Sequence, residues 1–478
     1  MDTSLLTNII AIVLVLFYVL AIASALEAIL KARTSQGAIA WAISLLTFPY
    51  VSVPLYLVFG RNKFDGYLEQ RDEIEAESLR MIRNTTGMIE EHIVPVSKDT
   101  PMYTSLFNLA RMPATTGNRV ELLINGQQTF DSILAGLVAA EKYILFQFYI
   151  IRDDELGRRL GRVMADKAKA GVKVFVLYDE IGSRKFPSTR LYRQLQMTGV
   201  KVAPFNTTQG RRNRFQLNFR NHRKNVVVDG KYAWIGGHNV GNEYLGLNTR
   251  IGHWRDTHTR VEGPAVLGAV LAFATDWRWA TRSRMDIDEF SSSRKGDSTV
   301  LVFPSDPASE YEEAGLMYHQ AIVGANQRIW IASPYFVPDH GIISALQLAA
   351  LRGVDVRVLI PDEPDGPMVA MANWAYTREL LPTGVKVYRY QGGFMHQKVL
   401  LMDDNIAGIG TANFDNRSFR LNFEITLLVH DPAFASQVDT MLQEDLRRSR
   451  QVSLEEIDNK PAWFPLAMAI ARMFSPVL

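Results

Sequence analysis

The same order of segments occurs twice along this sequence, and the repeat constrains the fold more than any other feature. The segment AKAGVKVFVLYDE around Gly171 recurs as ALRGVDVRVLIPDE around Gly353. The segment HRKNVVVD, which begins at His222, recurs as HQKVLLMD, which begins at His396. Segments that recur in the same order along a chain indicate one structural unit that is used twice. We therefore predict two lobes of one fold that pack as a pseudo-dimer about an internal twofold axis.

Each copy alternates strand-like and helix-like segments, which is typical of an α/β fold. ELLI, KYILFQFYI and KNVVV are short apolar runs, whereas SILAGLVAAE and ELGRRLGRVMADKAKA show helical spacing. Hydrophobic residues make up 47% of the 478 residues, which is enough for a sizeable core and excludes a disordered or collagen-like chain. The sequence has no cysteine, so disulfides, thiolate zinc sites and cysteine nucleophiles are excluded too.

Two uncharged stretches precede the repeat. Leu5 to Leu26 and Gly37 to Gly60 each reach the roughly 20 residues that cross a bilayer as a helix, so we predict a two-helix transmembrane hairpin. Pro49 and Pro54 leave an interfacial or re-entrant segment as the alternative for the second stretch. A secretory signal peptide is disfavoured, because the first stretch lacks a basic n-region and a cleavage site of small residues.

The charge around these stretches and the repeat boundaries predict the layout of the chain. More basic residues follow the second stretch than stand in the short loop, which favours cytosolic lobes. The apolar surface of the last helix could lie in the membrane interface or dock on the globular part. The predicted parts are a transmembrane hairpin (1–63), a linker helix region (64–118), the first lobe (119–285), a linker (286–297), the second lobe (298–459) and a C-terminal interfacial helix (460–478).

Each copy carries a His, a Lys two positions later and an Asp five positions after the Lys. The two sets are His222, Lys224 and Asp229, and His396, Lys398 and Asp403. Two matches at equivalent positions of a repeat are not chance, so we assign this motif as the catalytic centre. On a strand the His and the Lys share one face, whereas the Asp falls in the following turn. We therefore predict that the Asp supports the turn and does not touch substrate.

The hairpins that contain the motif predict which residues surround each His. A two-residue turn at Asp229-Gly230 would place His222 opposite Gly237, and the matching count places His396 opposite Thr411. Small residues leave room for something to approach the His, and two amides lie nearby. The phosphate-binding candidates are Asn239, Asn413, Thr411, Gly236 and Gly410.

The acids that orient the two His should come from outside the motif. The repeat that aligns Pro264 with Pro432 also aligns Asp256 with Glu424. Each of these carboxylates begins an alternating strand that could run beside its His strand. We predict that Asp256 and Glu424 orient the imidazoles, with surface carboxylates at strand edges as the alternative.

Two His, two Lys and two Asn suit a phosphodiester. Ammonium and amide groups neutralise its oxygens, one imidazole attacks phosphorus, and the other protonates the leaving alcohol. A metal site is disfavoured, because two ammonium groups repel a cation and no acidic ligand cluster accompanies them. We therefore predict phosphoryl transfer through a phosphohistidine, with no metal and no cofactor.

A basic patch precedes the first His. The whole chain has 52 Lys and Arg against 50 Asp and Glu, so no global field attracts nucleic acid. The patch comprises Arg211, Arg212, Arg214 and Arg220. Beside a predicted membrane hairpin we favour anionic phospholipid headgroups over nucleic acid or a plain solvated loop.

These features together resemble one family. HRKNVVVD with GGHN, HQKVLLMD with GTAN, the paired lobes and a two-span hairpin that ends in FGRN resemble the bacterial cardiolipin synthases of the phospholipase D superfamily. The resemblance covers nearly the whole chain. It implies two α/β lobes with mixed sheets, a multi-pass protein of the bacterial inner membrane, and conversion of two phosphatidylglycerols into cardiolipin and glycerol. A homo-oligomer is left open, and no nucleic-acid partner is expected.

The resemblance also implies the roles of the two His. His222 would be the nucleophile, and His396 the general acid and then the general base. In this family the first Gly of the segment after the motif, GGHN in one copy and GTAN in the other, is usually followed by Ser or Thr. Thr411 fits this pattern and Gly237 does not. Phosphate stabilisation in the first lobe would then rely on Lys224 and Asn239. Hydrolysis by the same site, a nuclease of the superfamily and a non-enzymatic membrane scaffold are the alternatives.

Overall fold

The computed structural model describes residues 3–32, 34–60, 64, 67, 90–97, 101–206, 208, 218–250, 252–287 and 293–476. It forms two units, which are described separately. The first comprises Met1–Glu69 and Thr207–Phe219, and the second comprises Gln70–Asn206 and Arg220–Leu478.

The first unit is a small helical assembly. Helix α1 (Thr3–Lys31) contains the segment Ser4–Lys31, which is long and apolar enough to cross a membrane. The predicted second span is not one continuous helix, because α2 (Ser35–Thr47) ends at Phe48 and α3 (Pro49–Leu55) begins there. Phe48 leaves the helical region at φ −129 and ψ 58, as the residue before a proline tends to do. Buried side chains of this unit include Ala21, Ala25, Ala28, Leu45, Val53 and Tyr56.

In α2 the thirteen helical residues extend only about 20 Å, less than the roughly 30 Å of a bilayer core. The chain continues through α3 into a π-helical turn, η1 (Tyr56–Gly60). Among the described residues, α1 is therefore the one helix that meets the length and composition of a membrane span.

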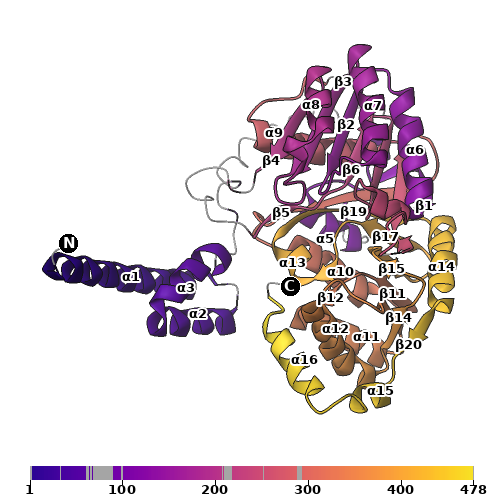
Figure 1. Cartoon of the computed structure of the whole chain (residues 1–478). Coiled ribbons are helices and arrows are strands. Elements are labelled where there is room, and N and C mark those ends of the chain that lie inside the picture. Colours follow the sequence, from indigo (N-terminus) through magenta and orange to yellow (C-terminus); the bar gives the residue numbers. More distant parts are fainter. Residues whose placement is uncertain are drawn as a thin grey trace. The chain divides into compact units, whose positions relative to one another are not determined.

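The second unit is built on a mixed sheet that runs through both lobes, as the α/β prediction requires (Figure 1). Strands β1 and β10 pair antiparallel and join the lobes, with Thr115 opposite Val300. Across the sheet the first lobe contributes β1 (Thr115–Ile124), β9 (Thr257–Glu262), β7 (Tyr232–Gly236), β6 (Asn225–Val228), β2 (Tyr143–Phe148), β3 (Lys173–Asp179) and β4 (Lys201–Phe205). The second contributes β10 (Ser298–Ser305), β19 (Asn422–His430), β17 (Ile406–Gly410), β16 (Val399–Met402), β11 (Arg328–Ala332), β13 (Asp355–Pro361), β14 (Lys386–Tyr390) and β20 (Ser449–Gln451).

Apart from β20 at the edge of the second lobe, this order is the same in both lobes when read outward from β1 and β10, so the sheet has the predicted internal twofold relation. Three parallel strands lie at the outer part of each half, β2, β3 and β4 in one and β11, β13 and β14 in the other. Most of their side chains are buried, because helices cover such strands on both faces.

Helices cover the sheet, and several begin at an acidic N-cap. Asp154, Asp339 and Asp431 each accept a backbone N–H at the first turn of α7, α11 and α14. The first lobe contains α6 (Asn125–Ala139), α7 (Glu155–Lys169), α8 (Arg190–Met197) and α9 (Val266–Thr281). The second contains α10 (Glu313–Gly324), α11 (His340–Leu351), α12 (Pro367–Leu380), α13 (Asn416–Arg420), α14 (Pro432–Arg447), α15 (Leu454–Asp458) and α16 (Phe464–Met473), and α5 (Pro101–Ala110) packs on its core.

The register predicted for the motif hairpins is wrong by one residue. The predicted pairs His222–Gly237 and His396–Thr411 would place Lys224 opposite Ile235 and Lys398 opposite Ile409. Asn225 and Val399 occupy these positions instead. Asp229 and Gly230 form the tight turn with positive φ, and the N–H of Lys231 donates to Val228 O (2.9 Å). Lys231 is then an extra residue before the ladder starts, which is a bulge that a two-residue turn does not contain. The motif His and Lys lie just before strands β6 and β16, not within them.

Candidate active site

Three two-residue strands, one of which pairs with the start of β19, bring the two lobes together around the motif. β5 (Arg220–Asn221) pairs in parallel with the start of β19, which places Asn221 opposite Phe423. β15 (Phe394–Met395) pairs in parallel with β8 (Trp254–Arg255), which places Met395 opposite Arg255. The residues that follow these pairs are His222 and Glu424 in the first case, and His396 and Asp256 in the second.

Each motif His is therefore held by a carboxylate of the other lobe. His222 Nδ1 lies 2.9 Å from Glu424 Oε2, and the N–H of His222 donates to Phe423 O (2.9 Å). His396 Nδ1 lies 2.8 Å from Asp256 Oδ2, and the N–H of His396 donates to Arg255 O (2.8 Å). The predicted acids do contact the imidazoles, but crosswise and not beside the His strand of their own lobe. In both rings the carboxylate occupies Nδ1, which leaves Nε2 as the reactive atom.

Both motif lysines are buried beside these rings. Lys398 Nζ lies 3.2 Å from His396 Nε2. Lys224 Nζ donates to the backbone oxygen of His222 (2.7 Å) and lies 5.5 Å from the Tyr149 ring, which is also 5.1 Å from the His222 ring. Each lysine also acts on the His of the other lobe, because Lys398 opposes protonation of His222 and Lys224 opposes protonation of His396. Two buried ammonium groups beside the motif His can supply the positive charge that a bound phosphate needs.

The protonation states of the site residues follow from the burial of their side chains. Burial, opposed by Glu424, lowers the pKa of His222 to about 4, and burial together with Lys398 lowers the pKa of His396 to about 3. Burial lowers the pKa of Lys398 to about 8 despite Asp256 and Glu424. The carboxyl pKa values of Asp256 and Glu424 are lowered, because the facing His and Lys outweigh the effect of burial. At neutral pH each Nδ1–H thus donates to an ionised carboxylate, and each Nε2 carries a lone pair.

The two lobes hold their carboxylates in different ways. In the second lobe the Thr411 hydroxyl donates to Glu424 Oε2 (2.6 Å) and accepts from the N–H of Ile425 (2.9 Å). In the first lobe Gly237 takes the place of Thr411, and a Cβ there would lie 2.0 Å from Asp256 Oδ1. Asp256 Oδ1 accepts a hydrogen bond from the N–H of Thr257 (2.8 Å). The Thr411 hydroxyl accepts the equivalent hydrogen bond from the N–H of Ile425 in the second lobe. A carboxylate oxygen of the shorter Asp thus replaces the hydroxyl.

This finding corrects the expected role of Thr411, because its hydroxyl holds an acid and does not point to a phosphate. The Asn239 amide is likewise engaged, with Oδ1 accepting from the N–H of Ile150 (3.1 Å) and Nδ2 donating to Tyr244 (3.2 Å). Asn413 is different, because its buried Oδ1 has no hydrogen-bond partner among the described residues. Of the two amides, Asn413 is thus the one whose oxygen has an unused acceptor position.

Gly236 and Gly410 provide space for neighbouring strands and not for a ligand at the His. A Cβ on Gly236 would lie 2.5 Å from His258 Cα, and one on Gly410 would lie 2.5 Å from Ile425 O. Close approach of the backbone therefore explains both glycines.

The motif aspartates support turns, as expected. Asp229 accepts from the N–H groups of Glu141, Lys142 and Tyr143 at 2.7 to 2.9 Å. Asp403 accepts in the same way from the N–H groups of residues 326, 327 and 328. Each Asp thus ties the motif hairpin to the strand beside it, and neither contacts a motif His.

Of the predicted basic patch, Arg211, Arg212 and Arg214 lie outside the described residues. Arg220 lies on β5 and is close enough to Tyr149 to oppose the rise that burial causes in the tyrosine pKa. Arg417 acts on the same tyrosine and was missed, although it follows Asn413 closely in NFDNRSF. Trp254 was missed too, and its ring lies 5.0 Å from the His396 ring. No motif signal marks an aromatic residue that packs on a His of the other lobe.

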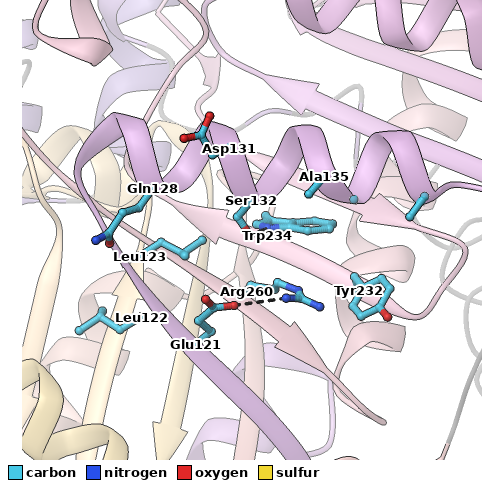
Figure 2. A pocket seen from close by; sticks show the side chains of 12 residues that line it. Glu121, Leu122, Leu123, Gln128, Asp131, Ser132, Ala135, Tyr232, Trp234 and Arg260 are labelled. Atoms are coloured by element: carbon cyan, nitrogen blue, oxygen red, sulfur yellow. Dashed lines mark hydrogen bonds and ion pairs between the residues drawn. The ribbon is translucent and has the colours of Figure 1, made fainter.

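A hollow between α6 and the strands β1, β7 and β9 is separate from this centre (Figure 2). Trp234 Nε1 donates to Ser132 Oγ (2.9 Å) there, and Arg260 pairs with Glu121 (3.3 Å). No motif residue lines it. Among the described residues no group of three or more His, Asp or Glu is arranged to hold a metal ion.

The Thr411–Glu424 and Gly237–Asp256 pairs predict that a second substitution restores activity lost through the first. Gly237→Thr places a Cβ against Asp256 and should lower kcat for the expected phosphatidyl transfer by about 100-fold, since a small misplacement has that cost. Asp256→Glu should also impair turnover, because the longer side chain lacks the hydroxyl that holds Glu424. The double variant recreates the Thr–Glu pair and should exceed either single variant by at least about tenfold. Independent, multiplicative losses in kinetic assays would contradict this coupling.

Comparisons with known proteins agree with this geometry. The family described as "Cardiolipin synthase, PLD-like domain" matches residues 133–257 and 318–446, and "Phospholipase D-nuclease N-terminal" matches residues 8–61. Cardiolipin synthase A of Pseudomonas putida is 46% identical over 471 residues, which cover 97% of each chain. Cardiolipin synthase A of Pseudomonas fluorescens is 45% identical over 468 residues, also 97% of each chain.

Among solved structures, phosphatidylserine synthase of Haemophilus influenzae has a similar fold, with a TM-score of 0.60 and 15% identity over 79% of this chain and 100% of that one. With full-length relatives at this level of identity and a family match in each lobe, the chain belongs to the cardiolipin synthase family of phospholipase D-like proteins.

Proposed function

We propose that this protein is a membrane-bound cardiolipin synthase that transfers a phosphatidyl group from one phosphatidylglycerol to another and releases glycerol. One observation carries the proposal: each motif His is held through Nδ1 by an acid of the other lobe. Two such imidazoles, each with Nε2 on the side away from its carboxylate and with a buried lysine beside it, suit a two-step displacement at phosphorus.

In the first step His222 Nε2 attacks phosphorus, and the bond from phosphorus to the glycerol oxygen breaks. The leaving oxygen takes a proton from His396 Nε2, while Lys224 and Lys398 neutralise the phosphate oxygens. The low pKa of His222 keeps its lone pair available at neutral pH. The negative charge of the bound lipid raises the pKa of His396 and lets it carry the proton it donates.

In the second step His396 takes a proton from a hydroxyl of the second phosphatidylglycerol. That oxygen attacks phosphorus, the bond to His222 Nε2 breaks, and cardiolipin leaves. One phosphodiester replaces another, so the reaction needs no nucleotide and, with lysines at the phosphate, no metal.

The surroundings of His396 support this division of roles. A cavity of about 750 Å³ is lined by no motif residue, but its lining includes Trp254 and Phe394, whose rings are 5.0 and 6.0 Å from the His396 ring. Polar groups such as Glu243 and Gln391 also line it. An aromatic and polar cavity suits a polyol, so the leaving and the attacking glycerol would occupy it in turn.

For the membrane part we propose a bacterial inner-membrane protein with cytosolic lobes. Helix α1 would span the bilayer, and α2 with α3 would complete the hairpin as a second, broken crossing. Broken helices are tolerated at membrane depth where protein satisfies the freed backbone groups. Arg220, with Arg211, Arg212 and Arg214, would attract anionic headgroups.

Hydrolysis by the same site, as in a phospholipase D, is the alternative that the chemistry leaves closest. Water would then capture the phosphohistidine. Purified protein with phosphatidylglycerol and EDTA should form cardiolipin in excess of phosphatidate, measured by lipid mass spectrometry. Phosphatidate as the main product would support the hydrolase, and strict dependence on added metal or nucleotide would contradict the proposed mechanism.

The covalent intermediate predicts opposite behaviour of the two His variants. His222→Ala should abolish the radiolabelled phospholipid adduct, because the nucleophile is gone. His396→Ala should accumulate it, because no base activates the acceptor. The matched control is His319→Ala on α10, outside the motif, which should leave the adduct level unchanged. A label that remains in His222→Ala and disappears in His396→Ala would reverse the roles.

The lysine environment predicts the alkaline limb of the pH profile. Lys398 loses its proton near pH 8, so kcat/KM should fall by about tenfold per pH unit above that value. The low pKa of His222 predicts no loss of the nucleophile between pH 5 and 8. Arginine keeps its charge at higher pH, so in Lys398→Arg the alkaline fall of the residual kcat/KM should begin at a higher pH. An unmoved limb would assign it to another group.

A further inference from the structure

The C-terminal helix α16, which Trp463 precedes, is apolar on two opposite faces. Its inner face packs against α12, where Phe464, Met468 and Ala471 are buried in the core of the second lobe. The Phe464 ring lies 6.0 Å from the Trp374 ring. This packing holds the helix on the globular unit, so docking, one of the two expectations for this segment, does occur.

The outer face carries large apolar side chains that no part of the described chain covers. Trp463 is 61% exposed, Leu466 is 65% exposed and Met473 is 78% exposed, and Ile470 and Phe474 are also exposed. Positions separated by three, four and seven residues lie on one side of a helix, so these residues form one face. A helix that is apolar all round is normally buried all round.

The single charge of this segment is turned to the protein. Arg472 is the one charged residue between Trp463 and Phe474, and its Nη2 lies 2.7 Å from Glu379 Oε2. Its guanidinium also lies 5.4 Å from the Tyr376 ring. The outer face is therefore uncharged over its whole length, which a water-facing helix of a globular protein rarely is.

The end of α16 is tied to the segment that carries site residues. Asn416 Nδ2 donates to Ser475 O (3.2 Å) and to Val337 O (2.9 Å). Asn416 begins α13, next to Arg417 and three residues after Asn413. Any partner surface that binds the outer face of α16 would therefore also lie close to the segment that contains Asn413.

We propose that the outer face of α16, defined by Trp463, Leu466, Ile470, Met473 and Phe474, lies in the surface of the lipid bilayer. Helix α1 is long and apolar enough to cross a bilayer, and this inference rests on the proposed function, in which the site takes lipid substrates. Tryptophan at the end of an apolar helix face is typical of interfacial helices. The helix would thereby hold the catalytic unit, and with it the Asn413 segment, at the lipid surface.

A second copy of the chain fits this face less well. A ten-residue helix is about 15 Å long and about 10 Å wide, so its footprint is far below the roughly 800 Å² per partner of a stable interface. A bilayer needs no such area, because it only adds to an anchor that the chain already has.

The absence of cysteine allows a direct test on the full-length protein. Leu466→Cys is labelled with an environment-sensitive fluorophore and reconstituted into vesicles of phosphatidylglycerol and phosphatidylethanolamine. The control is Thr440→Cys, an exposed position on α14, which Figure 1 places on the other side of the lobe from α16. The label at 466 should emit at shorter wavelength than the label at 440, and spin-labelled lipid should quench it at least twofold more.

This readout does not depend on catalysis, so it separates the membrane contact from the proposed function. Equal emission and equal quenching at the two positions would overturn the proposal. Blue-shifted emission at 466 without quenching by lipid would mean that protein covers the face, and would overturn it too. As a second variant, Leu466→Glu with Ile470→Glu should lower turnover of phosphatidylglycerol in vesicles at least fivefold but leave turnover of monomeric short-chain phosphatidylglycerol unchanged. Equal losses on both substrates would contradict an interfacial role.

Discussion

Parallel pairing of a few backbone residues across the lobes is the constraint on which the rest of the site depends. Asn221 beside Phe423, and Met395 beside Arg255, set the register that brings each His to the acid of the other lobe. A slip of one residue would turn the imidazole away from its carboxylate. Neither lobe is therefore complete alone, which gives a physical reason for the repeat to remain within one chain.

Burial determines the protonation states of these His–carboxylate pairs. In a dry site the imidazoles stay neutral and the carboxylates stay ionised, so the tautomer of each ring is set without a metal. The two halves are nevertheless unequal. The Thr411 hydroxyl donates a hydrogen bond to Glu424, whereas Asp256 bonds directly to the backbone and fills the space beside Gly237. Such inequality is consistent with the different roles proposed for the two imidazoles.

Much of this architecture was predictable from the sequence, because it depends on repetition and on residue type. The repeat predicted the α/β lobes and aligned Asp256 with Glu424. Three features were not predictable. The extra residue at Lys231 shifts the hairpin register, since both turn lengths suit an Asp-Gly pair. The lobe that supplies each acid depends on long-range pairing that no local pattern records. The break at Phe48 depends on how a helix responds to the following proline.

The central claim is that each imidazole depends on the carboxylate of the opposite lobe, and nitrogen chemical shifts of the two His test it most directly. With ¹⁵N-labelled histidine in the full-length protein, Glu424→Gln should move the Nδ1 and Nε2 resonances of His222 and leave those of His396 in place. Asp256→Asn should do the reverse. A shift of His396 in Glu424→Gln, with His222 unmoved, would mean that each lobe supports its own His and would contradict the account.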